Sequence, residues 1–352
     1  MKTEALAAAR LATAKRGFAV RNVPDAALAR LVCEPGSPAA GDVMLARVTS
    51  IGHHRQIELP SSRKATLFVG DEVIIACGAR YAPDQFEAEV PVDLGPCDLA
   101  AAGGIAGTVV SRHAGVGQPT RLQPIGLFAG VDGQVLNLRD FALPARPIAR
   151  SIPAIAVVGG SMNAGKTTAA ASLVRGLTLA GYRVGAAKLT GTGAGNDYWH
   201  MKDAGAVQVL DFTDAGLATT YRASPDALDH CVRALSAGLA TAGAEVAVFE
   251  IADGLFQKET AWLVGSRILR QSVSAYVYAG ESAASAAIGV QWLRRQGCHV
   301  LGVSGLVSAS PLAAREAEAA TGLACVTRDT LSTAAHARMW MSRLGSGQAA
   351  AA

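Results

Sequence analysis

The chain has 352 residues, of which half are hydrophobic and 17% are charged, and its mean hydropathy is +0.27. This composition excludes disorder over most of the length and is sufficient for a substantial hydrophobic core. The net charge of +4 is mild, and no dense Lys/Arg cluster with interleaved aromatic residues occurs, so we expect no nucleic-acid partner. Anionic small-molecule substrates remain compatible with this charge balance.

The cysteines and the N-terminal residues indicate the cellular compartment in which the protein is expected. The first twenty residues lack the apolar core of a signal peptide, and no apolar run reaches membrane-spanning length. The cysteines show neither C-x-x-C spacing nor a His partner at zinc spacing, which favours buried thiols in a reducing cytosol. We therefore expect a soluble, cytoplasmic protein with no membrane partner. The cysteines are Cys33, Cys77, Cys97, Cys231, Cys298 and Cys325.

The sequence of residues 1–144 predicts a β-rich domain with a short leading helix at residues 4 to 16. Short β-type runs separated by Gly, Pro and Asp favour an antiparallel barrel or sandwich. The adjacent His53 and His54 lack acidic partners at ligand spacing, so we expect a surface or turn pair. The β-type runs lie at residues 42 to 51, 55 to 59, 65 to 68, 72 to 76, 108 to 112 and 134 to 138.

A change of composition near residue 145 marks a predicted domain boundary. Three prolines between residues 144 and 153 disfavour a continuous helix, so residues 145–153 are interpreted as a Pro-rich linker. In residues 154–344, short apolar runs alternate with amphipathic helical patterns, which predicts an α/β fold with a mostly parallel sheet flanked by helices. Residues 345–352 are interpreted as a flexible tail. The strands are expected at residues 154 to 158, 183 to 188, 207 to 212, 246 to 251, 275 to 279, 299 to 304 and 324 to 326.

The sequence GSMNAGKTT at residues 160–168 fits the phosphate-binding pattern G-x-x-x-x-G-K-[ST]. An apolar strand candidate precedes it and a helical pattern from Thr167 to Ala180 follows, which is the context that such a loop requires. Glycines let successive backbone N–H groups converge on phosphate oxygens at a helix N-terminus, where the dipole favours an anion. We expect Lys166 to reach the outer phosphates and the Thr167 hydroxyl to ligate Mg²⁺. The predicted nucleotide-binding residues are Gly160, Ser161, Met162, Asn163, Ala164, Gly165, Lys166, Thr167 and Thr168.

An acidic strand end supplies candidates for a second Mg²⁺ ligand. Residues 245–254 read EVAVFEIADG, in which Glu250 closes a buried strand and Asp253 follows in the loop. Carboxylates at a strand end can hold Mg²⁺ directly or through water. Spacing does not choose between Glu250 and Asp253, and strand-end carboxylates facing solvent are the alternative.

The segment from Lys188 to Asp203 combines three glycines with Lys188, Asp197 and His200 at the end of a predicted strand. At the carboxyl end of a parallel strand it would lie beside the phosphate loop and contribute substrate contacts or a general base. We select Lys188 and Asp197 as catalytic candidates together with Lys166. The alternative is a capping loop, with Asp197 as the N-cap of the next helix.

Two further loops follow predicted strands. Residues 211–222 contain hydroxyls and acids that fit either a nucleotide-sensing switch or helix capping by Asp214. Residues 303–311 follow the strand at which related phosphate-loop proteins hold the base. Because no N-K-x-D sequence occurs, ATP is the default nucleotide and GTP stays open.

With these motifs in place, residues 152–328 resemble the SIMIBI class of P-loop proteins. Within that class, the loop at 160–168, Lys188 and the run from Asp197 to Ala206 are similar to molybdopterin-guanine dinucleotide biosynthesis adaptor proteins. The combination of Lys188 and Glu250 is similar to dethiobiotin synthetases. The resemblance implies ATP or GTP, Mg²⁺ and a homodimer, although Ser161 stands where many members carry a second lysine.

Two functions follow as expectations. The first is a Mg-ATP-dependent enzyme, a kinase-type phosphotransferase or a ligase, acting on a small polar metabolite such as a carboxylate. In it Lys166 would neutralise charge, Thr167 with Glu250 or Asp253 would hold Mg²⁺, and Lys188 and Asp197 would orient and activate the acceptor. The alternative is a nucleotide-switched GTPase or ATPase adaptor that delivers a cofactor or metal to a partner protein. A nucleotide-sensing structural protein is a third reading. The sequence names neither the acceptor nor the role of the β-rich domain.

Overall fold

The computed structural model describes residues 3–34, 36–145 and 152–349. Its contacts divide the chain into two compact units. The barrel unit comprises Met1–Leu143, Gly191–Asn196 and Phe212–Ala223, and the P-loop unit comprises Pro144–Thr190, Asp197–Asp211 and Ser224–Ala352. The division is therefore not a single cut near residue 145, because two loops of the C-terminal half belong to the barrel unit. Of the predicted linker, residues 146–151 lie outside the described residues.

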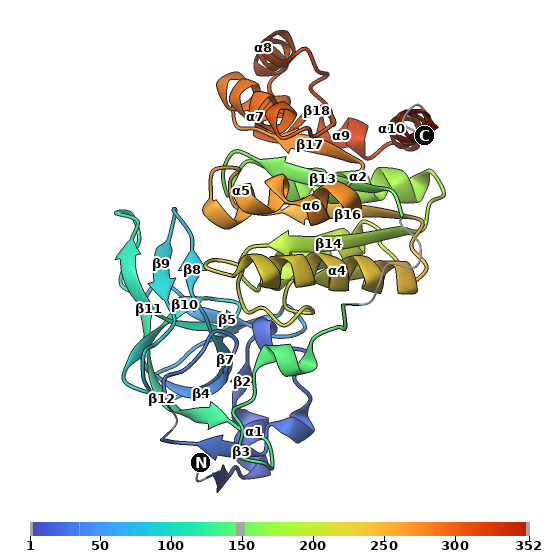
Figure 1. Cartoon of the computed structure of the whole chain (residues 1–352). Coiled ribbons are helices and arrows are strands. Elements are labelled where there is room, and N and C mark those ends of the chain that lie inside the picture. The colour runs from blue at the N-terminus through green and yellow to red at the C-terminus, as the bar shows by residue number, and fades with distance from the viewer. Residues whose placement is uncertain (1–2, 35, 146–151, 350–352) are drawn as a thin grey trace. The chain divides into compact units, whose positions relative to one another are not determined.

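The barrel unit is built from short strands and helical turns (Figure 1). Its strands are β1 (Glu4–Ala5), β2 (Lys15–Arg16), β3 (Arg30–Val32), β4 (Val43–Ser50), β5 (Gln56–Glu58), β6 (Lys64–Thr66), β7 (Glu72–Cys77), β8 (Arg80–Tyr81), β9 (Phe86–Glu89), β10 (Cys97–Ala101), β11 (Ile105–Arg112) and β12 (Thr120–Phe128). Its helices are α1 (Ala8–Thr13) and the 3-10 turns η1 (Phe18–Val20), η2 (Asp25–Ala27) and η3 (Leu138–Phe141).

Five strands close into a ring, which confirms the predicted β-rich barrel. β12 pairs with β4, β4 with β7, β7 with β11, β11 with β10, and β10 with β12. The β7–β11 pair is parallel, whereas the other pairs of the ring are antiparallel. Because successive side chains of a strand alternate between faces, Val43 and Leu45 join one hydrophobic cluster and Met44 and Ala46 join another.

Several expectations for this half are corrected. The leading helix is shorter than predicted, since only Ala8–Thr13 is helical and strands flank it on both sides. Residues 134 to 138 form no regular strand, because only isolated bridges join Val135 to Ala129 and Asn137 to Asp42. His54 is buried rather than at the surface, and its Nε2 lies 3.2 Å from the Ala100 carbonyl oxygen. Strand β12 was not anticipated, although its pairing with β4 closes the barrel.

The P-loop unit alternates strands and helices as its sequence predicts. Its strands are β13 (Ala154–Gly159), β14 (Val184–Thr190), β15 (Gln208–Asp211), β16 (Val246–Ile251), β17 (Ala275–Ala279) and β18 (Val300–Ser304). Its helices are α2 (Lys166–Leu179), α3 (Gly195–Asp203), which begins in the barrel unit, α4 (Pro225–Thr241), α5 (Lys258–Gly265), α6 (Arg267–Ser272), α7 (Ala283–Arg295), η4 (Leu306–Ala309), α8 (Pro311–Thr321), α9 (Arg328–Leu331) and α10 (Ala334–Ala349).

Six parallel strands form one sheet in the order β15-β14-β16-β13-β17-β18, which confirms the predicted α/β architecture. Helix α2 packs on the central strands, and α4 packs on β14 and β15. Figure 1 shows α4, α5 and α6 on the near face of this sheet. Every residue of β13, β14 and β16 is buried, as expected for parallel strands covered on both faces.

The ends of this unit also depart from expectation. Residues 324 to 326 contribute only a bridge between Cys325 and Val303 rather than a strand. Helix α10 runs to Ala349, so the tail predicted from residue 345 is helical over most of its length, and residues 350–352 lie outside the described residues. Cys33 is exposed and Cys325 half-buried, so not all cysteines are buried thiols. Among the described helices, none combines the length and apolarity needed to cross a membrane.

Candidate nucleotide-binding site

The phosphate loop joins β13 to α2 at the carboxyl edge of the parallel sheet. Gly165 precedes the helix in a left-handed conformation with φ of 92°, which glycine adopts without the strain of a side chain. The N-cap of α2 is Gly165, which has no side chain to cap the first amides. A helix N-terminus whose N–H groups lack side-chain partners attracts an anion. Ala164 is buried, whereas Ser161, Asn163 and Thr168 are exposed along the loop.

Lys166 is buried, and the loop curls around its ammonium group. Its Nζ donates to the carbonyl oxygen of Ser161 and lies 3.4 Å from that of Met162. Burial lowers the pKa of Lys166, while the carboxylates of Glu250 and Asp253 oppose that shift. The cation is thus placed inside the loop, where a phosphate oxygen would meet it.

Thr167 brings together two acids that are distant in sequence. Its Oγ1 lies 2.7 Å from Glu250 Oε1 and 3.1 Å from Asp197 Oδ1. One hydroxyl carries one proton, so it can donate to only one of these carboxylates at a time. Burial, followed by the charge of Asp197, raises the pKa of Glu250 to about 7. The oxygens of three side chains therefore converge at the first turn of α2.

Lys188 completes this cluster from strand β14. Its Nζ forms an ion pair with Asp197 Oδ2, and the lysine is buried. Burial works to lower the pKa of Lys188, but the carboxylates of Asp197 and Glu250 outweigh it, and the pKa is raised. Asp197 thus has Oδ1 at Thr167 and Oδ2 at Lys188. It lies in the first turn of α3 rather than at the N-cap, so the capping interpretation of Asp197 was wrong.

Asp253 lies in the loop after β16, and the backbone of that loop packs against the phosphate loop. Asp253 is buried with a positive φ of 62°, which is uncommon for a residue with a side chain. A Cβ atom added to Gly254 would lie 2.2 Å from the Gly160 carbonyl oxygen, and Leu255 N donates to Gly159 O at 3.0 Å. Asp253 is thereby held close to the loop, while Glu250, like Asp197, contacts the Thr167 hydroxyl.

The side chains present fit a Mg²⁺ ion. Mg²⁺ takes hard oxygen ligands, keeps several waters and uses one or two carboxylates of the protein. Thr167 Oγ1 and Glu250 Oε1 provide such oxygens, and the buried Glu250 Oε2 has no hydrogen-bond partner among the described residues. Within the described ranges no three His, Cys, Asp or Glu side chains cluster into an all-protein metal site.

A pocket of about 470 Å³ adjoins the phosphate loop. It lies at the end of β18, where the sequence predicts that a base is held. Residues after Val326 also line it, and that contribution was missed because the segment carries no recognised motif. The lining residues are Gly165, Thr168, Ala169, Ser304, Gly305, Leu306, Ser308, Ala309, Thr327, Arg328 and Asp329.

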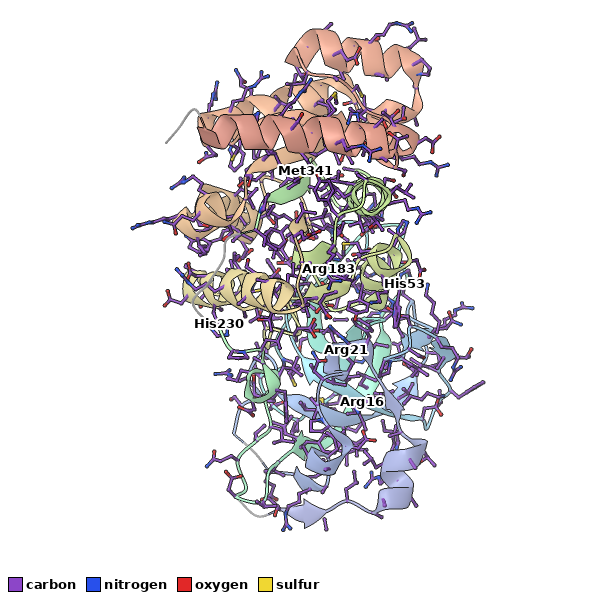
Figure 2. All side chains as sticks on the ribbon, turned by 90° about the vertical axis from the view of Figure 1, so that its right-hand side faces the viewer. Arg16, Arg21, His53, Arg183, His230 and Met341 are labelled. Atoms are coloured by element: carbon purple, nitrogen blue, oxygen red, sulfur yellow. The ribbon has the colours of Figure 1, made fainter. Side chains whose placement is uncertain are left out.

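Of the two predicted loops, Gly191–Asn196 and Phe212–Ala223 belong to the barrel unit. Arg21, labelled in Figure 2, donates from Nη2 to Asp214 Oδ2 at 2.8 Å, and Asn22 donates to Asp214 Oδ1 at 2.8 Å. The buried carboxylate of Glu58 accepts the N–H of Gly195 at 3.1 Å. Asp214 is therefore engaged by the side chains of the two residues that follow η1, which neither the switch nor the capping hypothesis anticipated.

The strand that precedes the phosphate loop, β13, lies directly beside β16, which carries Glu250, in an all-parallel sheet. Together with the loop, this arrangement gives the C-terminal half the parallel α/β fold of a P-loop domain, which is the fold that the resemblance to the SIMIBI class predicts. The particular similarities to molybdopterin-guanine dinucleotide adaptor proteins and dethiobiotin synthetases stay predictions.

The solved structures that are similar to the chain include the following two. The signal recognition particle 54 kDa protein of Aeropyrum pernix K1 in complex with GDP is 21% identical, matches 58% of this chain and has a TM-score of 0.36. Chloroplast FtsY of Physcomitrella patens is 13% identical, matches 55% of this chain and has a TM-score of 0.37. The chain spans 48% and 66% of their lengths, respectively. At these values neither likeness supports a conclusion about ligand or activity. No protein-family model and no curated protein matches the sequence.

Proposed function

We propose that the chain is a Mg²⁺-dependent nucleoside triphosphatase whose P-loop unit binds and hydrolyses ATP or GTP. The observation that carries the proposal is the convergence of Thr167, Glu250 and Asp197 at the first turn of α2, beside the buried Lys166. Lys166 and the loop amides would neutralise the phosphates, Thr167 and Glu250 would hold Mg²⁺, and the pocket after β18 would receive the base.

The contacts of the Asp197 carboxylate favour hydrolysis of the nucleotide over transfer of its phosphoryl group to a metabolite. A general base must be able to take a proton, yet both carboxylate oxygens of Asp197 are engaged, one of them by an ammonium group. Such a carboxylate is a weak base. We infer slow intrinsic hydrolysis of the kind used by a nucleotide-switched adaptor, with a protein partner or a second copy of this chain accelerating it.

A kinase or ligase is the second candidate, and one observation favours it. Lys188 is a buried ammonium at the carboxyl end of β14, a position from which it could hold a carboxylate-bearing substrate if Asp197 moved away. In that case the nucleotide would be turned over only with its acceptor, a small polar metabolite.

Phosphate release from ATP and from GTP tests the proposal, with Mg²⁺ and with excess EDTA. Lys166→Ala should lower the rate by about a hundredfold or more, because the charge beside the phosphates is lost. Lys258→Ala removes an exposed lysine of α5 and should leave the rate unchanged. Normal hydrolysis by Lys166→Ala would refute the assignment. ADP release that appears only when a metabolite pool is added would select the kinase or ligase.

A further inference from the structure

We propose that Glu281 is a positioning residue of the phosphate loop, which holds Ser161 in the conformation that receives the triphosphate. The inference rests on the proposed function and identifies a carboxylate that belongs to no motif. Glu281 lies two residues beyond β17, the strand that pairs with β13 on the side away from Glu250. It therefore approaches the loop from a different strand than the Mg²⁺ candidates.

The sheet register brings Glu281 to the loop. Gly159 at the end of β13 is paired with Ala279 at the end of β17, and the Gly160 N–H lies 3.3 Å from the Ala279 carbonyl oxygen. Strands β13 and β17 therefore end at the same level of the sheet. Consequently the residues that follow, Ser161 and Glu281, face each other just beyond the sheet.

Ser161 is fixed from two directions. Its hydroxyl donates to Glu281 Oε1, and its carbonyl oxygen accepts a hydrogen bond from Lys166 Nζ. The side chain is thus restrained by Glu281 while the peptide is restrained by the lysine that would meet the phosphates. A loop that is already held in its binding conformation loses less conformational entropy when the ligand binds.

Glu281 is itself held in one orientation. Ser285 Oγ donates to Glu281 Oε2 at 2.7 Å, and Tyr278 OH lies 2.9 Å from Ser285 Oγ. Since the single Ser285 proton goes to Glu281, the Tyr278 hydroxyl donates to Ser285. Although burial works against ionisation, hydrogen bonds from Ser161 and Ser285 keep the pKa of Glu281 lowered, so this carboxylate is charged at neutral pH.

The same hydroxyls and carboxylate pack on the backbone of Gly160. A Cβ atom at Gly160 would lie 2.6 Å from Ser285 Oγ and 2.8 Å from Glu281 Oε2 and Tyr278 OH. The network therefore constrains both the first glycine and the first variable residue of the loop. The negative charge of Glu281 repels a phosphate bound nearby, which weakens anion binding. We infer that holding the loop in its binding conformation offsets this repulsion.

Two substitutions of Glu281 distinguish the effect of its hydrogen bonds on nucleotide binding from the effect of its charge. Glu281→Gln removes the charge but keeps an oxygen for Ser161 and an amide for Ser285, whereas Glu281→Ala removes both contacts. We expect Glu281→Ala to weaken Mg²⁺-ATP and Mg²⁺-GTP binding about tenfold and Glu281→Gln to bind within about twofold of wild type or more tightly. Isothermal titration calorimetry measures both. Glu316→Gln removes an equal charge from an exposed position on α8 and should change nothing.

A double-mutant cycle identifies Ser161 as the residue through which Glu281 acts. Ser161→Ala should weaken binding by a similar factor, and the double variant should be no weaker than either single variant. Additive losses, unchanged affinity in Ser161→Ala, or equal changes in Glu281→Ala and Glu281→Gln would each overturn the inference. If Glu281→Ala does not fold, Ser161→Ala and Glu281→Gln decide alone, because Ser161 is exposed.

The same titrations separate this inference from the proposed function. Wild-type protein that binds neither nucleotide, or Lys166→Ala that binds both normally, contradicts the nucleotide site itself. Wild-type binding that Lys166→Ala abolishes and that Ser161→Ala and Glu281→Ala leave unchanged contradicts only the role of Glu281.

Discussion

The parallel sheet of the P-loop unit and the barrel differ in how far each strand is specified by its own residues. All six residues of β13 and all six of β16 are buried, and both read as continuous apolar runs apart from Glu250 at the site. Strand β11 instead begins buried and ends exposed, because the barrel covers only part of it. A strand covered on both faces is recognisable in isolation, whereas a barrel strand depends on its neighbours.

The two regions also use polar side chains differently. In the P-loop unit Lys166, Thr167 and Glu250 converge at one edge of the sheet. In the barrel unit, by contrast, the buried Thr120 and His54 bond to backbone groups. Convergence of charged side chains at a strand edge indicates chemistry, and dispersal onto backbone groups indicates support of the fold.

The largest expected effect compares one substitution in both regions. Thr167→Ala should lower triphosphate hydrolysis about 10²- to 10³-fold, since it removes the proposed Mg²⁺ ligand at the first turn of α2. Thr120→Ala should cost about 1–3 kcal/mol of unfolding free energy, because Thr120 Oγ1 accepts from Gly52 N at 2.9 Å and donates to His54 O at 2.6 Å. Phosphate release and urea unfolding measure the two effects. If Thr120→Ala abolished hydrolysis but kept full stability, the assignment of Thr120 to support of the fold would be contradicted.

A second comparison uses two glycines. Gly254→Ala should cost about 1–3 kcal/mol and weaken nucleotide binding, since its Cβ would lie 2.2 Å from the Gly160 carbonyl oxygen and backbone must shift. Gly117→Ala in the barrel unit meets no atom within 4 Å and should be neutral or stabilising by up to about 1 kcal/mol. Thermal unfolding and nucleotide titration check both variants. Equal behaviour of the two would show that the loop after β16 does not constrain the phosphate loop.

The smallest effect is a pH dependence that belongs to the barrel. Burial, then the charge of Arg80, lowers the pKa of His54 from 6.5 to about 3, so the folded state keeps it neutral while the unfolded state takes up a proton below pH 6.5. Stability is therefore lost as pH falls from 6.5 towards 3, by about 2 kcal/mol at pH 5. Urea unfolding at pH 7.5 and 5 should show this loss in wild type and a smaller one in His54→Gln. An equal loss in both would assign the acid sensitivity elsewhere.

Sequence reasoning was most successful where the signal is local. The strands from β13 to β18 and the start of α2 are recovered to within a residue or two. In the barrel it missed β12, whose proline at position 124 weakens the strand pattern. That strand is specified by its pairing with β4, more than seventy residues earlier in the chain.

For the site, the sequence identified the types of residue but not their contacts. Lys166, Thr167 and Glu250 follow from the motif and the strand end. Glu281 carries no motif, and only the Gly159–Ala279 register brings it to Ser161. Such pairs depend on the order of strands in the sheet, which no local pattern encodes.

The sequence by itself determined the parallel sheet and predicted the ligand class and the candidates for phosphate and Mg²⁺ binding, because glycine spacing and apolar periodicity are local properties of the chain. Tertiary structure alone decided that Glu250 contacts Thr167, that Asp197 pairs with Lys188, and that a barrel closes through the parallel β7–β11 pair. These outcomes required the side chains and strands of distant segments to meet, and the free energy of such contacts is set by packing.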